Sequence, residues 1–434
     1  MDPQLDRRQF LHSTAATTLT SSALASIAWT AASAARAADA PSGRVRLGLM
    51  GLNGRGTDLA GSFVNLPGCE IAYLCDVDER AIDKAASVVA SKQSAAPTKV
   101  KDFRRILDDP KVDALVIAAP DHWHAPATIL ACAAGKHVYV EKPASHNPRE
   151  GELMVEAAEK HKRVVQLGTQ RRSMPAMIEA VKRLQAGELG RVLFARGWYN
   201  NARPSIGRGK LATVPAWLDY ELWQGPAPER EFRDNVVHYN WHWFWHWGTG
   251  ELGNNGIHAL DCCRWGLGVD YPLRVTAGGG KYFYDDDQQT PDSHVVTYDF
   301  GDKMITWEGR NWHKRGFEGS SFGIVFYAER GSLVSEGASY KIYDAGGKQI
   351  SEGNGSDSQE PHLINFLDCI RSGERPNATI EEGHKSTLLC HLGNIAYRTG
   401  RTLNLDPNTH QLVGDAEAAK LWSREYRPGW EPKV

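Results

Sequence analysis

The sequence predicts two domains, a doubly wound α/β domain followed by an α+β domain with a large, mostly antiparallel open sheet. From residue 44 to about 168, short apolar runs alternate with amphipathic segments, which is the pattern of parallel strands joined by crossover helices. After residue 169, β-rich segments are separated by long loops rich in Gly and Trp. A length of 434 residues also exceeds what one hydrophobic core usually organises.

The first domain is predicted over residues 41–168. Its apolar runs, which predict the strands, lie at 45–50, 70–75, 114–118, 137–141 and 164–168. The amphipathic segments, which predict helices, include 79–90, 125–134 and 148–161. The last of these helices ends near a basic cluster, which suits the negative end of a helix dipole.

The second domain is predicted over residues 169–405, with a tail at 406–434. Its predicted strands lie at 192–199, 273–277, 294–300, 304–307, 323–328, 333–336 and 340–343. Residues 361–400 turn helical again, with candidate helices at 362–370 and 384–397. We expect these helices to pack at the junction between the domains.

Composition and charge exclude several classes of partner. The chain is 41% hydrophobic and 24% charged, as is ordinary for a globular protein, and its net charge is -2. Such a charge attracts neither nucleic acid nor an anionic membrane, so we expect small-molecule partners. The 7 cysteines are irregularly spaced and form no CxxC pair, which argues against a zinc ribbon or a disulfide framework.

The first 40 residues predict an export signal rather than part of the fold. Arg7 and Arg8 stand ahead of an Ala-, Ser- and Thr-rich stretch, and this arrangement resembles a twin-arginine signal. The stretch is broken by many Ser and Thr residues, whereas a membrane span needs roughly 20 strongly apolar residues. We therefore expect export to the periplasm by the twin-arginine machinery, without a membrane span. The alternative is a tail in which the two arginines occur by chance.

A glycine-rich turn follows the first predicted strand. Gly51 and Gly56 keep the outer positions of a GxGxxG turn, while Asn53 replaces the middle glycine and Gly54 follows it. Such a turn brings backbone amides at a helix N-terminus close to a pyrophosphate. Asn tolerates left-handed backbone geometry better than most residues. The turn, with Arg55 inside it, is therefore a candidate dinucleotide site, although such turns also occur without one.

The second predicted strand is followed by Asp76, 25 residues after Gly51. A carboxylate near this spacing accepts the ribose hydroxyls of NAD and disfavours the extra phosphate of NADP. The alternative is that Asp76 only caps the helix that follows. The order of strand, glycine turn, helix, strand and Asp favours an NAD site.

Two further motifs follow later strands of the first domain. Residues 119–124 read Ala-Pro-Asp-His-Trp-His, and residues 141–143 read Glu-Lys-Pro. Together with the glycine turn, they resemble the Gfo/Idh/MocA family of sugar and polyol oxidoreductases. The resemblance extends from about residue 44 to 405 and includes residues 166–172 and 256–261.

The resemblance implies roles for residues at the carboxyl ends of these strands. Pro120, His122 and His124 belong to the nicotinamide end of the cofactor site. Glu141 meets the cofactor ribose, and Lys142 reaches both nicotinamide and substrate. Open α/β sheets bind ligands at this end of the strands on physical grounds as well. A partly desolvated lysine beside a cationic nicotinamide has a lowered pKa, which suits proton transfer at a substrate hydroxyl. The alternative is a surface ion pair between Lys142 and Glu141.

In the second domain, residues 254–261 read Asn-Asn-Gly-Ile-His-Ala-Leu-Asp, where the family usually has Asp-x-Gly-x-His-x-x-Asp. The resemblance implies that His258 is the general base at the substrate hydroxyl. Asn254 replaces the first carboxylate, and an amide can orient a hydroxyl but cannot hold a proton. Asp261 either contacts substrate or is a buried carboxylate bonded nearby.

Residues 238–247 are unusually rich in His and Trp. At helical spacing His238, His242 and His246 share one face, and such a row can bind zinc with Glu251 as a further ligand. The aromatic residues favour a carbohydrate lining instead, because their faces bury sugar C–H groups while imidazoles bond hydroxyls. Plain core packing is the third alternative. We assign His242 and His246 to substrate binding and predict no metal.

Three further polar residues are candidates for substrate contacts. Arg171 and Arg172 lie at the predicted domain boundary, and Tyr199 ends the first strand of the second domain. The alternative for the two arginines is that they are solvated surface charges.

These features predict an NAD-dependent oxidoreductase that removes a hydride from a sugar or glycoside hydroxyl. An exported enzyme has no pool of fresh NAD, so we expect the cofactor to be tightly bound. A held cofactor also suits a cycle of oxidation, elimination, hydration and reduction, which resembles NAD-dependent glycosidases, or an epimerase or dismutase. A non-catalytic sugar or cofactor sensor is the remaining alternative. Open sheets in this family often pair face to face, so a homodimer or tetramer is expected.

Overall fold

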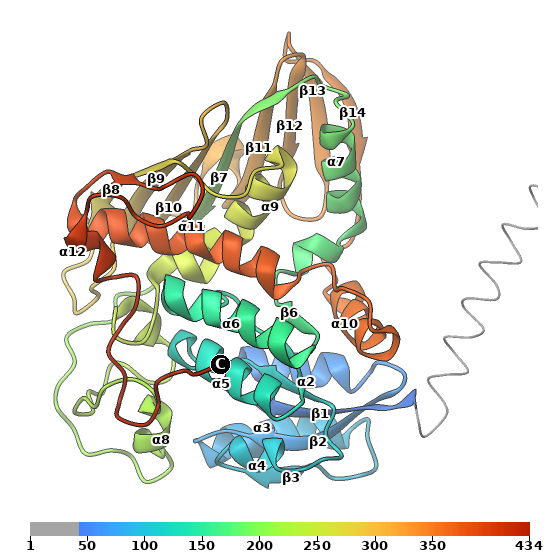
Figure 1. Ribbon diagram of the computed structural model, residues 1–434, viewed down its shortest axis with the longest axis vertical. Helices are drawn as coiled ribbons and strands as arrows, with labels where there is room; N and C mark the ends of the chain where they lie inside the picture. The colour runs from blue at the N-terminus through green and yellow to red at the C-terminus, as the bar shows by residue number, and fades with distance from the viewer. Residues whose placement is uncertain (1–42) are drawn as a thin grey trace, which may run out of the picture.

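The computed structural model describes residues 43–434, so the predicted signal at 1–40 lies outside the described residues. Two separate sheets organise the chain (Figure 1). Their strand content confirms the predicted fold class, a Rossmann-type parallel sheet and a second, mostly antiparallel sheet. Among residues 43–434, none of the helices combines the length and the apolar character that a membrane span requires.

The first sheet has the strand order β3-β2-β1-β4-β5-β6, and all of its strand pairs are parallel. Its strands are β1 (Val45–Met50), β2 (Cys69–Cys75), β3 (Thr98–Val100), β4 (Ala114–Ile117), β5 (His137–Val140) and β6 (Val165–Leu167). The buried strands read as continuous apolar runs because helices cover both faces of the sheet. Strand β3 escaped prediction because its exposed residues carry no such run.

The helices of the first domain are α2 (Arg55–Phe63), α3 (Glu79–Ala90), α4 (Arg104–Leu107), α5 (Asp121–Ala133) and α6 (Pro148–His161). Two of them, α3 and α6, begin at side-chain caps. Asp78 caps α3 by accepting from the backbone N–H of Arg80, and Asn147 caps α6 in the same way from Glu150. Helix α5 begins at Asp121, four residues earlier than predicted, so the residues after Pro120 lie in its first turns rather than in a loop.

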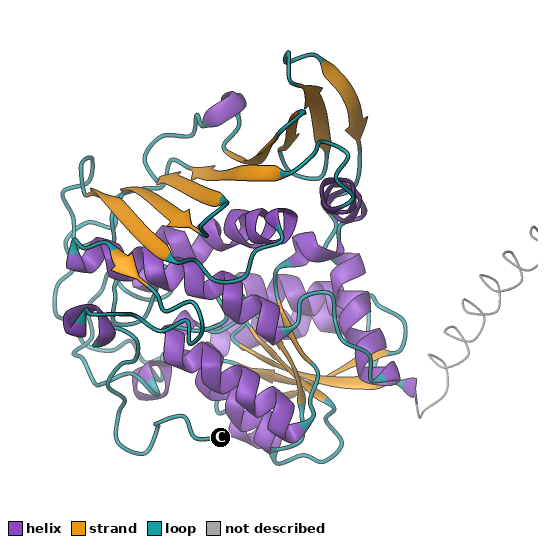
Figure 2. Cartoon of the chain, turned by 45° about the horizontal axis from the view of Figure 1, so that its top comes forward, coloured by secondary structure: helices purple, strands orange, loops and turns teal. Residues whose placement is uncertain are grey.

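The second sheet has the order β14-β13-β12-β11-β7-β10-β9-β8-β15. Only the pair β7 and β10 is parallel. The strands are β7 (Val192–Asn200), β8 (Arg274–Gly280), β9 (Ser293–Asp299), β10 (Met304–Arg310), β11 (Phe322–Ala328), β12 (Gly331–Ser335), β13 (Tyr340–Asp344), β14 (Gln349–Gly353) and β15 (Leu403–Asn404). Figure 2 shows helices beneath this sheet.

The core of the second domain lies between this sheet and its helices. The helices of this part are α7 (Pro175–Gln185), α8 (Tyr220–Gln224), α9 (Ile257–Leu267), α10 (Glu360–Ser372), α11 (Ile380–Thr399) and α12 (Ala416–Ala419). Trp307 and Phe326 of the sheet pack in one buried cluster with Leu389 of α11. Figure 1 shows α11 between the two sheets, which is the junction where a helix was predicted.

Two segments outside the regular layers return to the first domain. Residues 217–247 contribute a small buried cluster of their own, which includes Trp223, Phe232 and Trp247. The chain end runs back beside α5, as Figure 1 shows, and Trp430 packs against the core of the first domain. Both segments therefore lie close to the carboxyl ends of the parallel strands.

Candidate active site

A cavity of about 310 Å³ lies at the carboxyl ends of the parallel strands. It is lined by the glycine turn, by Asp76, and by the polar residues that follow β4 and β5. Residues of the second domain, among them Trp223, His242 and Asn254, form its other walls. The predicted nucleotide motif and part of the predicted substrate motif therefore share one chamber.

The glycine turn has the geometry that close approach of a dinucleotide requires. Gly51 has φ +83°, and a Cβ on it would lie 2.5 Å from the backbone nitrogen of Ala119. A Cβ on Gly56 would lie 1.7 Å from the oxygen of Gly51, whereas Gly54, at φ +70°, faces open space. Asn53 lines the cavity beside them, where the middle glycine is usual. These residues fit a pyrophosphate approached by backbone N–H groups at the start of α2.

Asp76 lies where a ribose-binding carboxylate is expected. The side chain lines the cavity, with 7% of its surface exposed. Its carboxylate accepts from the backbone N–H of Leu52 at 2.5 Å and from that of Asp78 at 2.9 Å. Burial raises the pKa of Asp76, and these hydrogen bonds oppose the shift. The predicted alternative, a cap for α3, is taken by Asp78 instead.

Glu141 is held by an ion pair beneath the glycine turn. Its carboxylate accepts from Nε of Arg55 at 2.7 Å. Burial alone would raise the pKa of Glu141, but the charges of Arg55 and Lys142 outweigh burial and hold it below its usual value. Glu141 is therefore an anion beside the predicted cofactor ribose. A Cβ on Gly168 would lie 2.9 Å from this carboxylate, so a larger residue there would displace it.

Lys142 points across the cavity to the second domain. Its Nζ donates to the backbone oxygen of Asn254 at 2.8 Å and to the side-chain Oδ1 at 3.2 Å. Burial lowers the pKa of Lys142, while the charges of Glu141 and Asp121 oppose the shift. The predicted alternative, a surface ion pair, does not describe this lysine, because its ammonium bonds Asn254 inside the cavity.

Asn254 lies in a π-helical turn, Leu252–Gly256, which leads directly into α9. Such a turn often marks a functional site, because it redirects side chains away from the regular helical positions. These residues belong to the predicted motif, but the turn was not predicted. Repeated Gly and Asn residues at 253–256 are a weak signal for it.

His258 lies close enough to Lys142 and Arg171 for their charges to act on it. Burial lowers its pKa well below the usual value, and both cations lower it further. The ring is therefore neutral at neutral pH, and its buried Nδ1 has no hydrogen-bond partner within residues 43–434. Arg171 donates to the backbone oxygen of Gly337 at 2.8 Å and lies over the ring of Phe322. Neither His258 nor Arg171 lines the cavity directly.

Asp121 is a buried carboxylate in the cavity wall that the sequence analysis did not select. It is 2% exposed, it accepts from the hydroxyl of Thr249 at 2.6 Å, and burial raises its pKa. Its charge acts on Lys142. The signal for it was present in the sequence, since Asp121 belongs to the same motif after β4 as the two predicted histidines.

The two histidines of this motif differ in position. His124 lines the cavity, but its ring nitrogens lie 2.6 Å from the oxygen of Pro143 and 2.8 Å from that of Ala119. His124 therefore joins the two motif loops. His122 is fully buried, lies 3.0 Å from the oxygen of Trp223 and is absent from the cavity wall. Its position gives no support to the predicted cofactor contact.

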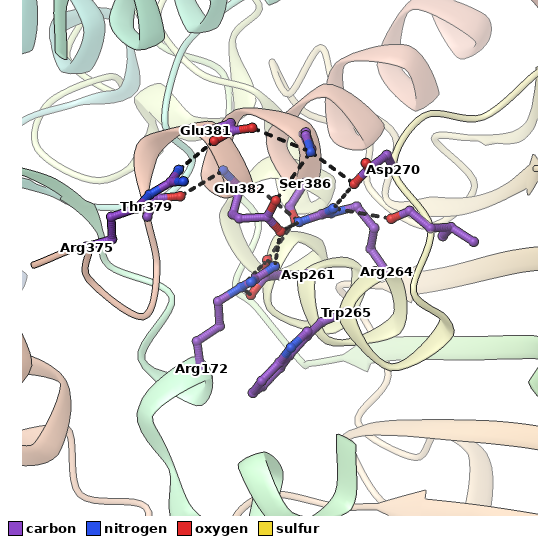
Figure 3. A network of polar contacts seen from close by, with 12 residues as sticks. Arg172, Asp261, Arg264, Trp265, Asp270, Arg375, Thr379, Glu381, Glu382 and Ser386 are labelled. Carbon is purple, nitrogen blue, oxygen red and sulfur yellow. Dashed lines mark hydrogen bonds and ion pairs between the residues drawn. The ribbon is translucent and has the colours of Figure 1, made fainter. Parts of the chain in front are cut away.

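Arg172 and Asp261 form a buried ion pair away from the cavity. Nε of Arg172 donates to both carboxylate oxygens, at 3.0 and 2.9 Å, and the side chains are 5% and 1% exposed. Figure 3 shows Arg264, Glu382 and Ser386 around this pair. Both residues were predicted to contact substrate, and their position outside the cavity wall gives no support to that prediction. The alternative of a solvated surface charge is wrong for Arg172, and the buried-carboxylate alternative describes Asp261. Both side chains stabilise the contact between α9 and α11.

A second ion pair, between Arg203 and Glu251, lies outside the cavity wall, but its charges act on Lys142 and His242. The guanidinium of Arg203 donates to Glu251 at 2.6 and 3.1 Å, and Asn255 donates to the same carboxylate. Burial, and then the charge of Glu251, raise the pKa of Tyr199. Glu251 was considered only as a zinc ligand, so the sequence analysis missed this pair.

The helical row of histidines, considered as an alternative for zinc binding, does not form. The segment contains only the short 3-10 turn Asn240–Trp243, and its histidines face different partners. His238 lies 2.9 Å from Asp78, His242 stacks on Trp241, and His246 lies 2.8 Å from the oxygen of Pro228. The aromatic rings determine the local path, because Trp241 and Trp247 belong to a buried cluster. Within residues 43–434, no group of acidic, His or Cys side chains is arranged to hold a metal ion.

Only part of this segment lines the cavity. Tyr239, Trp241 and His242 do so, whereas His246 does not. Burial lowers the pKa of His242 to about 3, so the ring is neutral. Core packing therefore describes Phe244 and Trp247, while the carbohydrate lining stays a prediction for the residues that line the cavity.

Comparison with known proteins agrees with this architecture. Residues 45–169 match the model described as "Oxidoreductase family, NAD-binding Rossmann fold". Residues 205–432 match "Oxidoreductase family, C-terminal alpha/beta domain". The fold and the site thus define an NAD-binding oxidoreductase of two domains. The chain belongs to the Gfo/Idh/MocA oxidoreductase family.

Relatives of assigned function cover only a part of the sequence. A glycosyl hydrolase family 109 protein of Saccharopolyspora erythraea is 34% identical over 36% of this chain and 35% of its own length. A levoglucosan dehydrogenase of Pseudarthrobacter phenanthrenivorans is 34% identical over 25% of this chain and 28% of its own length. The match therefore spans about a third of these proteins.

Solved structures resemble the chain over most of its length. Levoglucosan dehydrogenase in complex with NADH and levoglucosan superposes with a TM-score of 0.66 at 17% identity, over 83% of this chain and 99% of that one. Aldose-aldose oxidoreductase of Caulobacter crescentus superposes with a TM-score of 0.64 at 19% identity, over 83% and 100%. At these identities the likeness concerns the fold.

Proposed function

We propose that the protein oxidises a hydroxyl of a sugar or glycoside by hydride transfer to an NAD that stays bound. The contact between Lys142 and Asn254 carries this proposal, because it places a lysine of lowered pKa where the two domains meet around the cavity. The relatives named for levoglucosan oxidation and glycoside hydrolysis support a carbohydrate substrate. NAD, when bound, accepts a hydride from the hydroxyl-bearing carbon and can return it.

The residues of this chain have distinct roles in the proposal. Lys142 takes the hydroxyl proton as the hydride leaves. His258, which is neutral but does not line the cavity, is the second candidate acceptor. Asn254 orients the amine without supplying a charge. Tyr239 and Trp241 give the apolar face of a sugar a surface to stack on. Asp76 favours NAD over NADP through its negative charge.

Export makes retention of the cofactor part of the proposal. The twin-arginine signal predicts a protein working in the periplasm, where NAD is not supplied. If NADH is not released from the protein, its hydride has to return to a sugar before the next oxidation. The chemistry is then redox-neutral, and three forms of it fit: glycoside hydrolysis, epimerisation, and oxidation of one sugar with reduction of another.

Glycoside hydrolysis is a second candidate, favoured by the family 109 relatives. Oxidation of a sugar hydroxyl to a ketone acidifies the adjacent C–H. A base removes that proton, the glycosidic oxygen leaves, water adds, and the ketone is reduced again. His242, which lines the cavity, is a candidate for the additional acid or base, whereas His246 and Tyr199 are not in the cavity wall.

A glycoside panel tests the proposal. The purified protein is given aryl glycosides and free sugars, with and without added NAD, while aglycone release and NADH absorbance are followed. Turnover without added NAD supports a held cofactor, and aglycone release identifies the hydrolytic form. Consumption of one added NAD per product identifies a plain dehydrogenase and contradicts retention. Lys142→Ala is expected to remove the activity, and full activity in this variant would contradict the assigned site. Binding of sugar without any turnover would leave the sensor alternative.

A further inference from the structure

The end of the cavity away from Lys142 has a wall that the nucleotide-binding domain does not supply. In the strand order β3-β2-β1-β4-β5-β6, β2 and β3 lie on the other side of β1 from the strand that precedes Lys142. The residues after β2 and β3 therefore meet the adenosine half of a dinucleotide. Facing them are residues 217–238 of the second domain, which we call the covering segment; Leu222, Trp223 and His238 of this segment line the cavity.

The covering segment is docked on the turn between β2 and α3. The backbone N–H of Asp219 donates to the oxygen of Val77 at 3.0 Å. His238 Nε2 lies 2.9 Å from the carboxylate of Asp78, whose side chain is 4% exposed. Arg80 lies 3.6 Å over the ring of Trp217. Each of these contacts joins the two domains directly beside Asp76.

The covering segment also lies flat against the start of α5. Helix α8 ends at Gly225, which has φ +46°, and a Cβ there would lie 1.9 Å from Trp123. Trp123 itself lines the cavity, and its indole N–H donates to the oxygen of Trp223 at 3.0 Å. Only a glycine allows α8 to approach Trp123 this closely.

The C-terminal tail holds the covering segment from the outside. The backbone N–H of Arg427 donates to the oxygen of Pro226 at 3.1 Å, and its guanidinium donates to that of Glu221 at 3.2 Å. Trp430 packs edge-on against Trp123 at 5.1 Å between ring centroids. The tail therefore joins α8 to the first domain behind the cavity wall.

We propose that the covering segment, held by the C-terminal tail, binds the adenosine half of NAD and retains the cofactor. This inference rests on the proposed function, in which NAD stays bound, and it names the residues responsible. Leu222 and Trp223 bury the apolar face of the adenine, and His238 fixes the segment to Asp78. Release of the dinucleotide requires these contacts to separate, so they set its dissociation rate.

Release of bound NADH measures this directly. NADH is bound to the purified protein, excess NAD is added, and the loss of energy transfer from tryptophan to NADH gives the dissociation rate. Gly225→Ala places a methyl group against Trp123 and is expected to accelerate release by about ten-fold or more, on the scale of one lost buried contact. Gly207→Ala is the matched control, because Gly207 also has a left-handed backbone, at φ +63°, but has nothing within 4 Å.

Two further variants test the other contacts without a steric clash. His238→Ala removes the contact to Asp78, and Arg427→Ala removes the side-chain contact of the tail to α8. Each is expected to raise the dissociation rate by about ten-fold. Arg401→Ala is the control for the arginine, since Arg401 pairs with Asp415 and does not line the cavity.

The outcomes separate this inference from the proposed function. Faster release in Gly225→Ala, His238→Ala and Arg427→Ala, with both controls like wild type, supports the proposal that the covering segment binds the adenosine half of NAD. Equal rates in wild type, His238→Ala and Arg427→Ala overturn it, even where NADH release is slow and turnover needs no added NAD. If turnover of wild type requires added NAD while the variants still release NADH faster, the proposed function with a permanently bound NAD is contradicted. The covering segment is then still supported as the binding site of the adenosine half.

Discussion

Nζ of Lys142 lies 2.8 Å from the backbone oxygen and 3.2 Å from the side-chain oxygen of Asn254, so this lysine joins the two domains inside the cavity. The partner is an amide where the family usually has a carboxylate. An amide accepts a hydrogen bond but adds no negative charge to stabilise the ammonium. Burial therefore lowers the pKa of Lys142 with less opposition than a carboxylate would provide.

Asn254→Asp tests this reading through the pH dependence of activity. A negative charge beside the ammonium raises the pKa of Lys142. If the neutral amine is the base, activity rises with pH through this pKa, so the acidic limb of the kcat/KM profile shifts to higher pH. Asn254→Ala, which adds no charge, is the control. An unchanged or downward-shifted limb in Asn254→Asp would show that Lys142 is not the titrating base.

Arg171 and Arg172 are adjacent in sequence but are predicted to differ in their effects. Arg172 is paired in the interior with Asp261, and removing one partner of a buried pair costs about 3–5 kcal/mol. Arg172→Met is therefore expected to lower the free energy of unfolding by that amount, measured in urea, with little change in KM of the folded enzyme. Arg171→Met is expected to raise KM instead, because Arg171 lies near His258. A higher KM with unchanged stability in Arg172→Met would show instead that Arg172 contacts substrate.

The network in Figure 3 predicts a loss of stability in acid. Burial raises the pKa of Glu382, but Arg264 and Arg172 outweigh it and lower the value to about 2. A glutamate in an unfolded chain titrates near about 4.3. The stabilisation is thus complete above roughly pH 4.3 and is lost as the pH falls toward about 2. Urea unfolding is measured at pH 7 and at pH 3. The free energy of unfolding is expected to fall less between these pH values in Glu382→Gln than in wild type. An equal fall in both proteins would show that Glu382 does not cause the loss of stability in acid.

Apolar side chains exposed on the outer face of the second sheet predict a homodimer. Val295, Met304 and Tyr327 are 48%, 38% and 43% exposed. All three project from the face opposite α9 and α11. A second copy of this face is expected to cover them, and Tyr327→Glu is expected to shift the protein toward monomer in light scattering. Leu211→Glu, at a residue 60% exposed and outside the sheet, is the control. A monomeric wild type would contradict the prediction.

The regular layers could be predicted from sequence because their patterns are local. Strand β4 is buried on both faces and every residue in it is apolar, while β1 and β5 are apolar except at Arg46 and His137, which are only partly buried. Strands such as β9 and β10 alternate between a buried and a solvent face. The aromatic segment was misread because its conformation depends on distant partners. His238 contacts Asp78, and Trp247 contacts Trp223. Contacts between residues so far apart in sequence cannot be predicted from the spacing of apolar residues.

The site was predicted only where a motif marked it. Lys142, Glu141 and Asp76 line the cavity as expected. The ion pair between Arg203 and Glu251 joins residues 48 positions apart in sequence, so no local sequence pattern predicts it. Arg172 and Asp261 were predicted to contact substrate but form a buried ion pair with each other. The sequence around them does not distinguish these two roles.

The number of product molecules formed per bound cofactor tests the central claim most directly. The protein is purified, its NAD content is measured after denaturation, and substrate is added with no free NAD. A held and recycled cofactor predicts many product molecules for each bound NAD, with no net NADH at the end. A reaction that stops at one product or fewer per bound NAD, with NADH accumulating, would contradict it.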